Sequence, residues 1–180
     1  MTSTPAGSDR DALLEESLDR QAIWVQVPVM AENFRLLAAK DLLGFVGPDA
    51  MPSGATRALV EGIDSPSVRQ LAGMDGADSD DMRAMFRAAL RELAIEYPSP
   101  REAAILLATE VARRITQGTV SPYEGASEIW GIVRSSSEHL PELDTFVYGA
   151  SEWEERPKAH KRFAAGIVAA AHDLVHSGSS

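Results

Sequence analysis

The sequence contains no cysteine among its 180 residues. This absence excludes disulfide bonds, thiolate metal ligands and cysteine nucleophiles from the chain. Long apolar runs are missing as well. Runs such as Ala103–Ala108 are far too short to cross a bilayer, so no membrane-spanning segment is expected.

Basic residues are scarce relative to acidic ones. The chain has 17 Lys and Arg against 27 Asp and Glu, a formal net charge of -10. Negative charge repels phosphate backbones, which makes nucleic-acid binding unlikely on physical grounds. The same charge keeps a small protein soluble, and it could also face a basic protein partner.

Export signals are not evident in residues 1–9, which lack a basic start followed by an apolar run. We therefore expect a cytoplasmic protein. Hydrophobic residues make up 44% of the chain, which is enough to build a core. A disordered tail is expected over residues 1–8 and a frayed end over residues 177–180.

Helical spacing of apolar residues dominates the remainder of the chain. It predicts an all-α fold, a single domain over residues 9–176 formed by a bundle of about eight or nine helices. The most apolar helix, near residues 100–117, is expected to be the buried centre. The expected helices cover residues 9–26, 29–45, 55–62, 66–72, 81–96, 100–117, 122–134, 141–156 and 157–176.

For residues 22–29 the sequence is compatible with either a helix or a strand. Its alternating Val, Ile and Trp favour a strand, but Pro28 would interrupt one and no partner strand is evident.

Two of the predicted helix starts have the same sequence pattern. Ser99 and Ser121 each precede a proline and are followed three residues later by Glu102 and Glu124. This is the capping-box pattern, in which the serine hydroxyl and the glutamate each satisfy a free backbone N–H. It explains both glutamates without a catalytic role. An acidic loop, residues 73–81, lacks the glycine and closing glutamate of a calcium loop and is interpreted as a helix start.

The segments GTVSPYEGASEIW and FVYGASEWEERP, with LVEGIDSPSVRQLAG upstream, resemble a group of uncharacterised small acidic all-helical proteins of actinobacteria. The resemblance covers about residues 58–174. It implies an all-helical fold and a bacterial cytoplasmic origin. It implies no activity and no catalytic residues.

A candidate site for a ligand or metal is formed by acids, aromatic residues and one histidine near the two tryptophan-containing segments. If the helices at 122–134 and 142–155 face each other, their carboxylates and imidazole could bind a ligand or a cation, or act as general acid and base. The alternative is that the aromatic side chains belong to the core and the acids are solvated. The residues are Tyr123, Glu128, Trp130, Glu152, Trp153, Glu155 and His160.

Three classes of function follow from these patterns. The first is a non-enzymatic protein-interaction or regulatory module of the bacterial cytoplasm, with another protein as partner and no cofactor. The second is a metal- or carboxylate/His-dependent enzyme or small-ligand binder at the candidate site. The third is a helix-turn-helix regulator around Gly62–Pro66, which the acidity and the few base-reading side chains, Arg69 and Gln70, disfavour. No zinc pair is assigned to His172 and His176, which have no evident third ligand.

Overall fold

The computed structural model describes residues 32–177, and within this range every regular element is a helix. The predicted all-α fold is confirmed. The predicted helix 9–26, the ambiguous segment 22–29, the N-terminal tail and residues 178–180 lie outside the described residues. By their contacts the described residues divide into two compact units, each described by itself here. The expected single domain over residues 9–176 stays a prediction.

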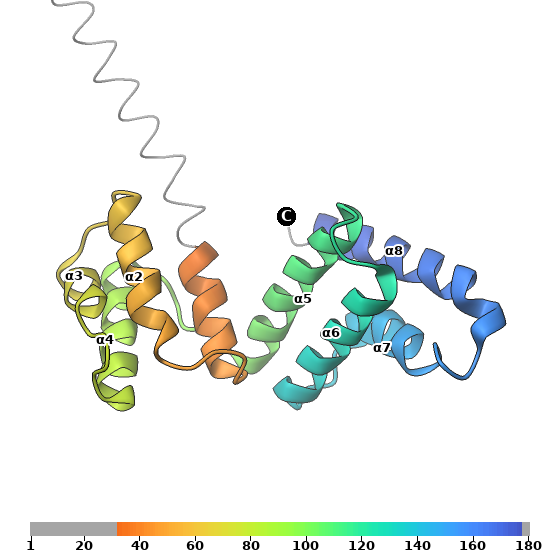
Figure 1. Cartoon of the computed structure of the whole chain (residues 1–180), viewed down its shortest axis with the longest axis horizontal. Coiled ribbons are helices and arrows are strands. Elements are labelled where there is room, and N and C mark those ends of the chain that lie inside the picture. The colour runs from red at the N-terminus through yellow and green to blue at the C-terminus, as the bar shows by residue number, and fades with distance from the viewer. Residues whose placement is uncertain (1–31, 178–180) are drawn as a thin grey trace, which may run out of the picture. The chain divides into compact units, whose positions relative to one another are not determined.

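The first unit contains Phe34 and residues 51–95. Its helices are α2 (Ala50–Val60), α3 (Pro66–Ala72) and α4 (Ser79–Glu92), with α3 packed on α4 (Figure 1). The rings of Phe34 and Phe86 stack in its interior with centroids 5.7 Å apart. This contact follows the apolar spacing that the sequence predicts for the helices at 29–45 and 81–96.

A carboxylate joins α3 to α4. Glu92 accepts hydrogen bonds from the Ser67 backbone N–H at 2.9 Å and from the Ser67 hydroxyl at 2.7 Å. Hydrogen bonds from the side chains of Ser65 and Ser67, and then from the Ser67 backbone, lower the pKa of Glu92 from its usual 4.5. The ionised carboxylate therefore satisfies free N–H and O–H groups at the start of α3.

The predicted helix 81–96 is too long at its C-terminal end. In the structure α4 stops at Glu92, and Ala94 adopts a left-handed backbone with φ 54°. The N–H of Ile95 donates to the Leu90 carbonyl at 2.8 Å, which closes the last turn. Such a left-handed stop usually uses glycine or asparagine, so an alanine at this position does not predict it.

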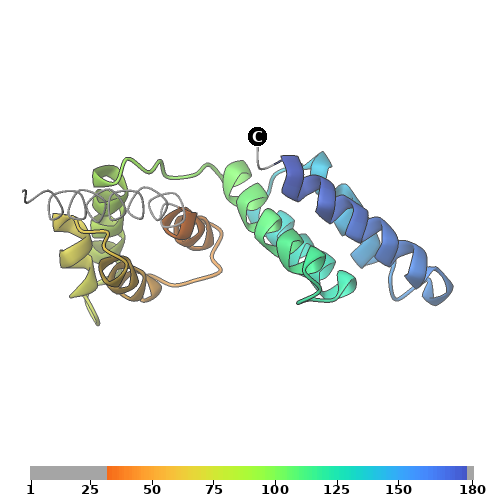
Figure 2. The same ribbon diagram turned by 90° about the horizontal axis from the view of Figure 1, so that it is seen from above.

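The second unit contains residues 35–50 and 96–177. Its helices are α5 (Pro100–Thr116), α6 (Pro122–Ser136), the 3-10 turn η1 (Pro141–Leu143), α7 (Asp144–Ser151), the 3-10 turn η2 (Pro157–Ala159) and α8 (His160–Ser177). Helix α5 packs on α6 and α8, and Figure 2 shows α8 in blue running beside α5 in green. Eight α5 residues are buried, which agrees with the predicted central helix.

Both capping boxes form as predicted. The Glu102 carboxylate accepts from the Ser99 backbone N–H at 2.8 Å, and the Glu124 carboxylate accepts from the Ser121 N–H at 3.2 Å. Hydrogen bonds from the backbone and then the hydroxyl of Ser99 lower the pKa of Glu102, and those from the hydroxyl and backbone of Ser121 lower the pKa of Glu124. These glutamates act at the helix starts, as the pattern indicates.

Three predicted features of this unit are wrong. The helix expected over residues 29–45 is described from residue 32 and ends at residue 42, so Phe45 follows it and is 46% exposed. Trp130, expected to face the core, is 36% exposed. The helix expected over 141–156 is interrupted at both ends, because η1 precedes α7 and α7 stops at Ser151.

Candidate functional site

Three of the predicted site residues meet in one stack of rings within the second unit. Trp153 lies between Tyr123, at a centroid distance of 4.9 Å and an interplanar angle of 22°, and His160, at 4.2 Å and 10°. Tyr123 comes from the first turn of α6, Trp153 from the segment after α7, and His160 from the start of α8. The stack therefore connects three parts of the unit through flat apolar contacts.

The histidine of this stack is held by a backbone contact. His160 Nε2 lies 2.6 Å from the Trp153 carbonyl oxygen. Because a carbonyl oxygen only accepts, Nε2 carries the proton and donates it. This nitrogen is thus engaged in closing the segment between α7 and α8, and it is not available as a metal ligand or base in this conformation.

The two glutamates of the Ser-Glu-Trp-Glu-Glu segment that were assigned to the site differ in environment. Glu152 is one-quarter exposed and its Oε2 lies 2.8 Å from Arg156 Nε, an i,i+4 ion pair. That oxygen is buried and has no hydrogen bond of acceptable geometry. The positive charge of the Arg156 guanidinium therefore compensates this oxygen without an aligned N–H. Glu155 is exposed.

Glu128 lies apart from the ring stack. Its two carboxylate oxygens lie 3.0 and 3.1 Å from Arg114 Nη1, which joins α6 to α5. Both side chains line a groove of about 140 Å³ that also includes Lys40, Phe45, Leu107, Glu110, Val111 and Ile132. Glu128 lines this groove and Glu152 does not, so the seven predicted residues do not share it. Within residues 32–177, no three His, Asp or Glu side chains are placed to hold a single metal ion.

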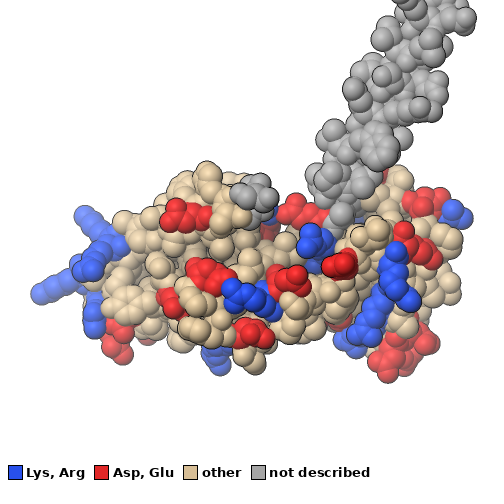
Figure 3. All heavy atoms as spheres, turned by 180° about the vertical axis from the view of Figure 1, so that it is seen from behind, with Lys and Arg blue, Asp and Glu red and all other residues tan. Residues whose placement is uncertain are grey.

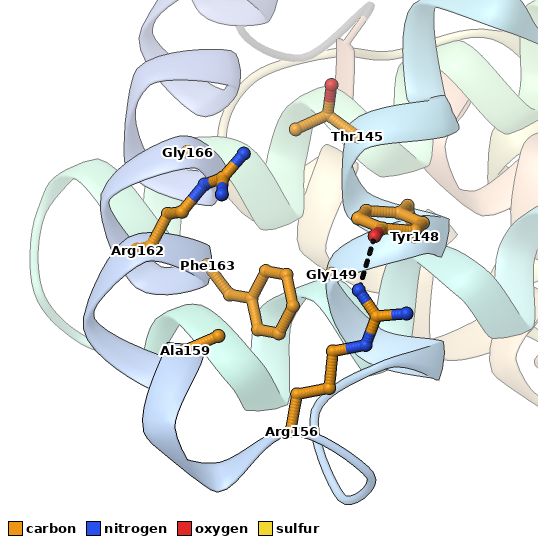
Figure 4. A pocket seen from close by; sticks show the side chains of 8 residues that line it. All are labelled: Thr145, Tyr148, Gly149, Arg156, Ala159, Arg162, Phe163 and Gly166. Carbon is orange, nitrogen blue, oxygen red and sulfur yellow. Dashed lines mark hydrogen bonds between the residues drawn. The ribbon is translucent and has the colours of Figure 1, made fainter.

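The structure contains a second cavity, which the sequence did not predict. It has a volume of about 300 Å³ and lies where α7, η2 and α8 meet (Figure 4). Aromatic and small residues form its walls, and two arginines flank them. The lining residues are Thr145, Tyr148, Gly149, Arg156, Ala159, Arg162, Phe163 and Gly166.

The two aromatic walls of this cavity are ordered by contacts with each other and with the stack. Phe163 meets Tyr148 edge to face, with centroids 5.9 Å apart and an interplanar angle of 83°. Phe163 also lies 6.4 Å from Trp153. The Tyr148 hydroxyl accepts a long hydrogen bond of 3.4 Å from Arg156 (Figure 4), so the cavity is continuous with the predicted cluster through aromatic contacts.

The two arginines are not equivalent. Arg156 is paired with Glu152. Arg162 is exposed, and in the described part of the chain it forms no ion pair. Figure 4 shows the two guanidinium groups on opposite sides of Phe163, with that of Arg162 directed across the cavity toward α7. Arg162 is therefore the cation that an incoming anion could pair with.

Two basic side chains, Arg156 and Arg162, line this cavity, and two more, Lys158 and Lys161, lie in the same short segment of the chain. Arg156, Lys158, Lys161 and Arg162 fall within seven residues that contain no acid, although three glutamates precede them. Figure 3 shows blue side chains gathered at the far left, over the start of α8. We call these four residues with the cavity the basic face. The run of cations is visible in the sequence, but the cavity beside it is not, because the cavity depends on which residues α7 places opposite α8.

Comparisons with known proteins identify no relative. No family model matches the chain, no curated protein matches it, and no solved structure matches it. No helix among residues 32–177 has the length and apolar character needed to cross a bilayer.

Proposed function

We propose that this protein is a non-enzymatic protein-interaction or regulatory module of the bacterial cytoplasm, and that it binds an acidic segment of another protein through the basic face. The observation that carries the proposal is the concentration of four cations within residues 156–162, two of which line an aromatic cavity, in a chain of net charge -10. At physiological salt, charges are screened over about 8 Å. The charges within this segment, and not the acids elsewhere in the chain, therefore decide what binds at this face.

Three of the cations are available to a partner. Arg156 is neutralised by Glu152, whereas Lys158, Lys161 and Arg162 are exposed and have no ion pair within the described residues. Exposed cations around an apolar centre are the usual layout of a binding surface, with a polar rim that steers the partner and a centre that excludes water.

The candidate acid–base groups support binding over catalysis. His160 donates Nε2–H to a carbonyl, Glu152 pairs with Arg156, and Glu128 pairs with Arg114. Each group has a structural contact, and none lies next to another in an acid–base pair. An enzyme or ligand site formed jointly by Glu128 and Glu152 is the weaker proposal, because Glu128 lines the groove beside α5, whereas Glu152 does not, and each is paired with a different arginine.

The helix-turn-helix alternative is also weaker. Arg69, one of the two side chains suited to reading base edges, donates to Asp64 through Nη2 at 2.9 Å. Its guanidinium is thereby engaged at the start of α3, and the acidic charge of the chain opposes binding to phosphate.

The test begins with purification of the tagged full chain from its source cells and identification of stoichiometric co-purifying proteins. Each candidate is then purified, and its affinity is measured by calorimetry with wild type, Lys161→Glu and Arg134→Glu. The last variant is a matched control, because it makes the same charge change on an exposed residue of α6.

We expect Lys161→Glu to weaken binding by about tenfold, which corresponds to about 1.4 kcal/mol, and Arg134→Glu to change it little. Binding should also weaken as salt is raised. The proposal is wrong if no purified candidate binds the chain, or if both variants bind as wild type does.

A further inference from the structure

We infer that the cavity between α7 and α8 receives the C-terminal aromatic residue of the partner chain, with its ring against Phe163 and Tyr148 and its free carboxylate paired with Arg162. This inference rests on the proposed function, because it names the group that the basic face recognises. It follows from three properties of the cavity: one uncommitted cation, two aromatic walls and a small volume.

The Arg162 guanidinium favours an anion that lies against α7. The Arg162 guanidinium points across the cavity (Figure 4), and the Thr145 hydroxyl lines the same space. A carboxylate placed between them accepts paired N–H bonds from the planar guanidinium and one O–H bond from the threonine. Arg156 contributes less, since its charge is already balanced by Glu152.

The aromatic walls select a flat apolar group. Tyr148 is 52% exposed, an unusual exposure for a large ring on a short helix, and Phe163 is half-buried beside it. The two rings contact each other edge to face, and both residues line the cavity. A further ring can pack there in the offset or edge-on geometries that aromatic groups prefer.

The cavity volume favours a C-terminal residue of the partner chain over an internal one. A cavity of about 300 Å³ lies at the lower limit of ligand pockets, about 300–1,000 Å³. An internal aromatic residue with a neighbouring Asp or Glu needs room for two side chains and for the chain to leave in two directions. A C-terminal Phe or Tyr carries ring and carboxylate on one residue and needs a single exit.

Gly166 contributes to this space. It lines the cavity from α8, and a Cβ built on it has no atom within 4 Å. A larger side chain at this position would occupy the cavity without displacing the packed residues. Gly131 on α6 has the same open surroundings outside the cavity, so it provides a matched control for any substitution of Gly166.

The experiment titrates the isotope-labelled full chain and follows backbone amide shifts by NMR. The probes are N-acetyl-phenylalanine, its C-terminal amide, N-acetyl-alanine, benzoate, and a hexapeptide ending in phenylalanine with either a free or an amidated C-terminus. We expect the free-acid phenylalanine probes to shift amides of α7 and α8. The amides should bind about three- to fivefold more weakly, as loss of one partly exposed ion pair predicts, and N-acetyl-alanine should not bind measurably.

Two pairs of variants assign the binding to the cavity. Gly166→Leu should abolish the shifts, and Gly131→Leu should leave them as in wild type. Arg162→Gln should remove the preference for the free acid over the amide, and Lys161→Gln should retain it, since Lys161 is not part of the cavity lining. Far-UV circular dichroism of each variant verifies that it is folded.

The outcomes separate this inference from the proposed function. If a purified partner binds and Lys161→Glu weakens it, but Gly166→Leu does not, the basic face binds a protein and the cavity does not receive its terminus. If benzoate binds and the peptides do not, the cavity is a small-molecule site and the inference is overturned. Equal binding of acid and amide, or no shift with any phenylalanine probe, also overturns it.

Discussion

Helix α6 approaches α5 so closely at Gly125 that this position has no room for a side chain. A Cβ built on Gly125 would lie 2.5 Å from Ile115 Cγ1 and 2.6 Å from Ile115 Cδ1. Carbon atoms in contact normally lie about 3.5–4.0 Å apart, so Gly125→Ala requires a displacement of about 1 Å. Ile115 is buried, and β-branching restricts its χ1 rotation in a helix. The side chain therefore has little freedom to move away.

The expected loss follows from two opposing effects. Overpacking a core costs about 1–3 kcal/mol, and replacing a helical glycine by alanine contributes about 0.5–1 kcal/mol in the other direction. The net expectation is a destabilisation of up to about 2.5 kcal/mol, and each 1 kcal/mol lowers Tm by about 2–4 °C in a chain of this size. The matched variant is Gly131→Ala on the same helix, where nothing lies within 4 Å of the added Cβ. It should raise stability by about 0.5–1 kcal/mol.

The measurement is urea and thermal unfolding of wild type and both variants, followed by circular dichroism. A third and a fourth variant, Ile115→Ala alone and with Gly125→Ala, complete a double-mutant cycle. Ile115→Ala alone should cost about 2–5 kcal/mol by leaving a cavity, and Gly125→Ala should then be neutral or stabilising in its background. If Gly125→Ala is as stable as Gly131→Ala, or if the two sites are additive, the close approach of α5 and α6 is incorrect.

Three further substitutions test other contacts. Glu92→Gln should lower the free energy of unfolding most above pH 4.5, and the loss should shrink as pH falls through the lowered pKa of Glu92, because the ionised carboxylate is the stabilising form. The stability of wild type, Glu92→Gln and the control Glu96→Gln, at an exposed neighbouring position, is measured as a function of pH. A loss that does not change with pH would contradict this prediction. Ser121→Ala removes the cap of α6 and should lower the free energy of unfolding by about 1 kcal/mol, whereas Ser127→Ala within the same helix should change it very little. Equal losses of stability in urea unfolding would argue against the capping box. Phe146→Ala truncates a fully buried ring of α7 and should cost about 3–5 kcal/mol, and a loss below about 1 kcal/mol would show that α7 is not packed into the core.

Local signals predicted the starts of α5 and α6 well because the capping contacts span only a few residues, whereas α2, predicted to start at residue 55, starts at Ala50. The hydroxyls of Ser99 and Ser121 reach N–H groups three positions away, so the pattern alone determines the partners. The positions where helices stop were harder to predict. Ala94 takes a left-handed conformation that its sequence does not favour, and it does so where the chain turns after packing α4 on α3.

The candidate site shows the same limit over longer separations. Sequence spacing grouped Tyr123, Trp153 and His160 correctly, because aromatic residues near short helices tend to meet in a small core. It could not assign Glu128, whose partner Arg114 lies 14 positions earlier on a different helix. The basic face was missed for a related reason: whether a run of cations is a solvated surface or the rim of a cavity depends on what the adjoining helix places opposite it.

The ring stack and the cavity are parts of one structure. Tyr123 contacts Trp153, Trp153 lies near Phe163, and Phe163 contacts Tyr148, so aromatic contacts run from the first turn of α6 to the cavity wall. His160 fixes the backbone at Trp153, which holds the segment that carries Arg156. Tyr123, Trp153 and His160 are therefore connected to the cavity through Phe163, and the side chains that line the cavity include Arg162, Tyr148 and Phe163. Since side chains held by stacked rings lose little further freedom when a ligand binds, this support favours a preformed cavity at the basic face.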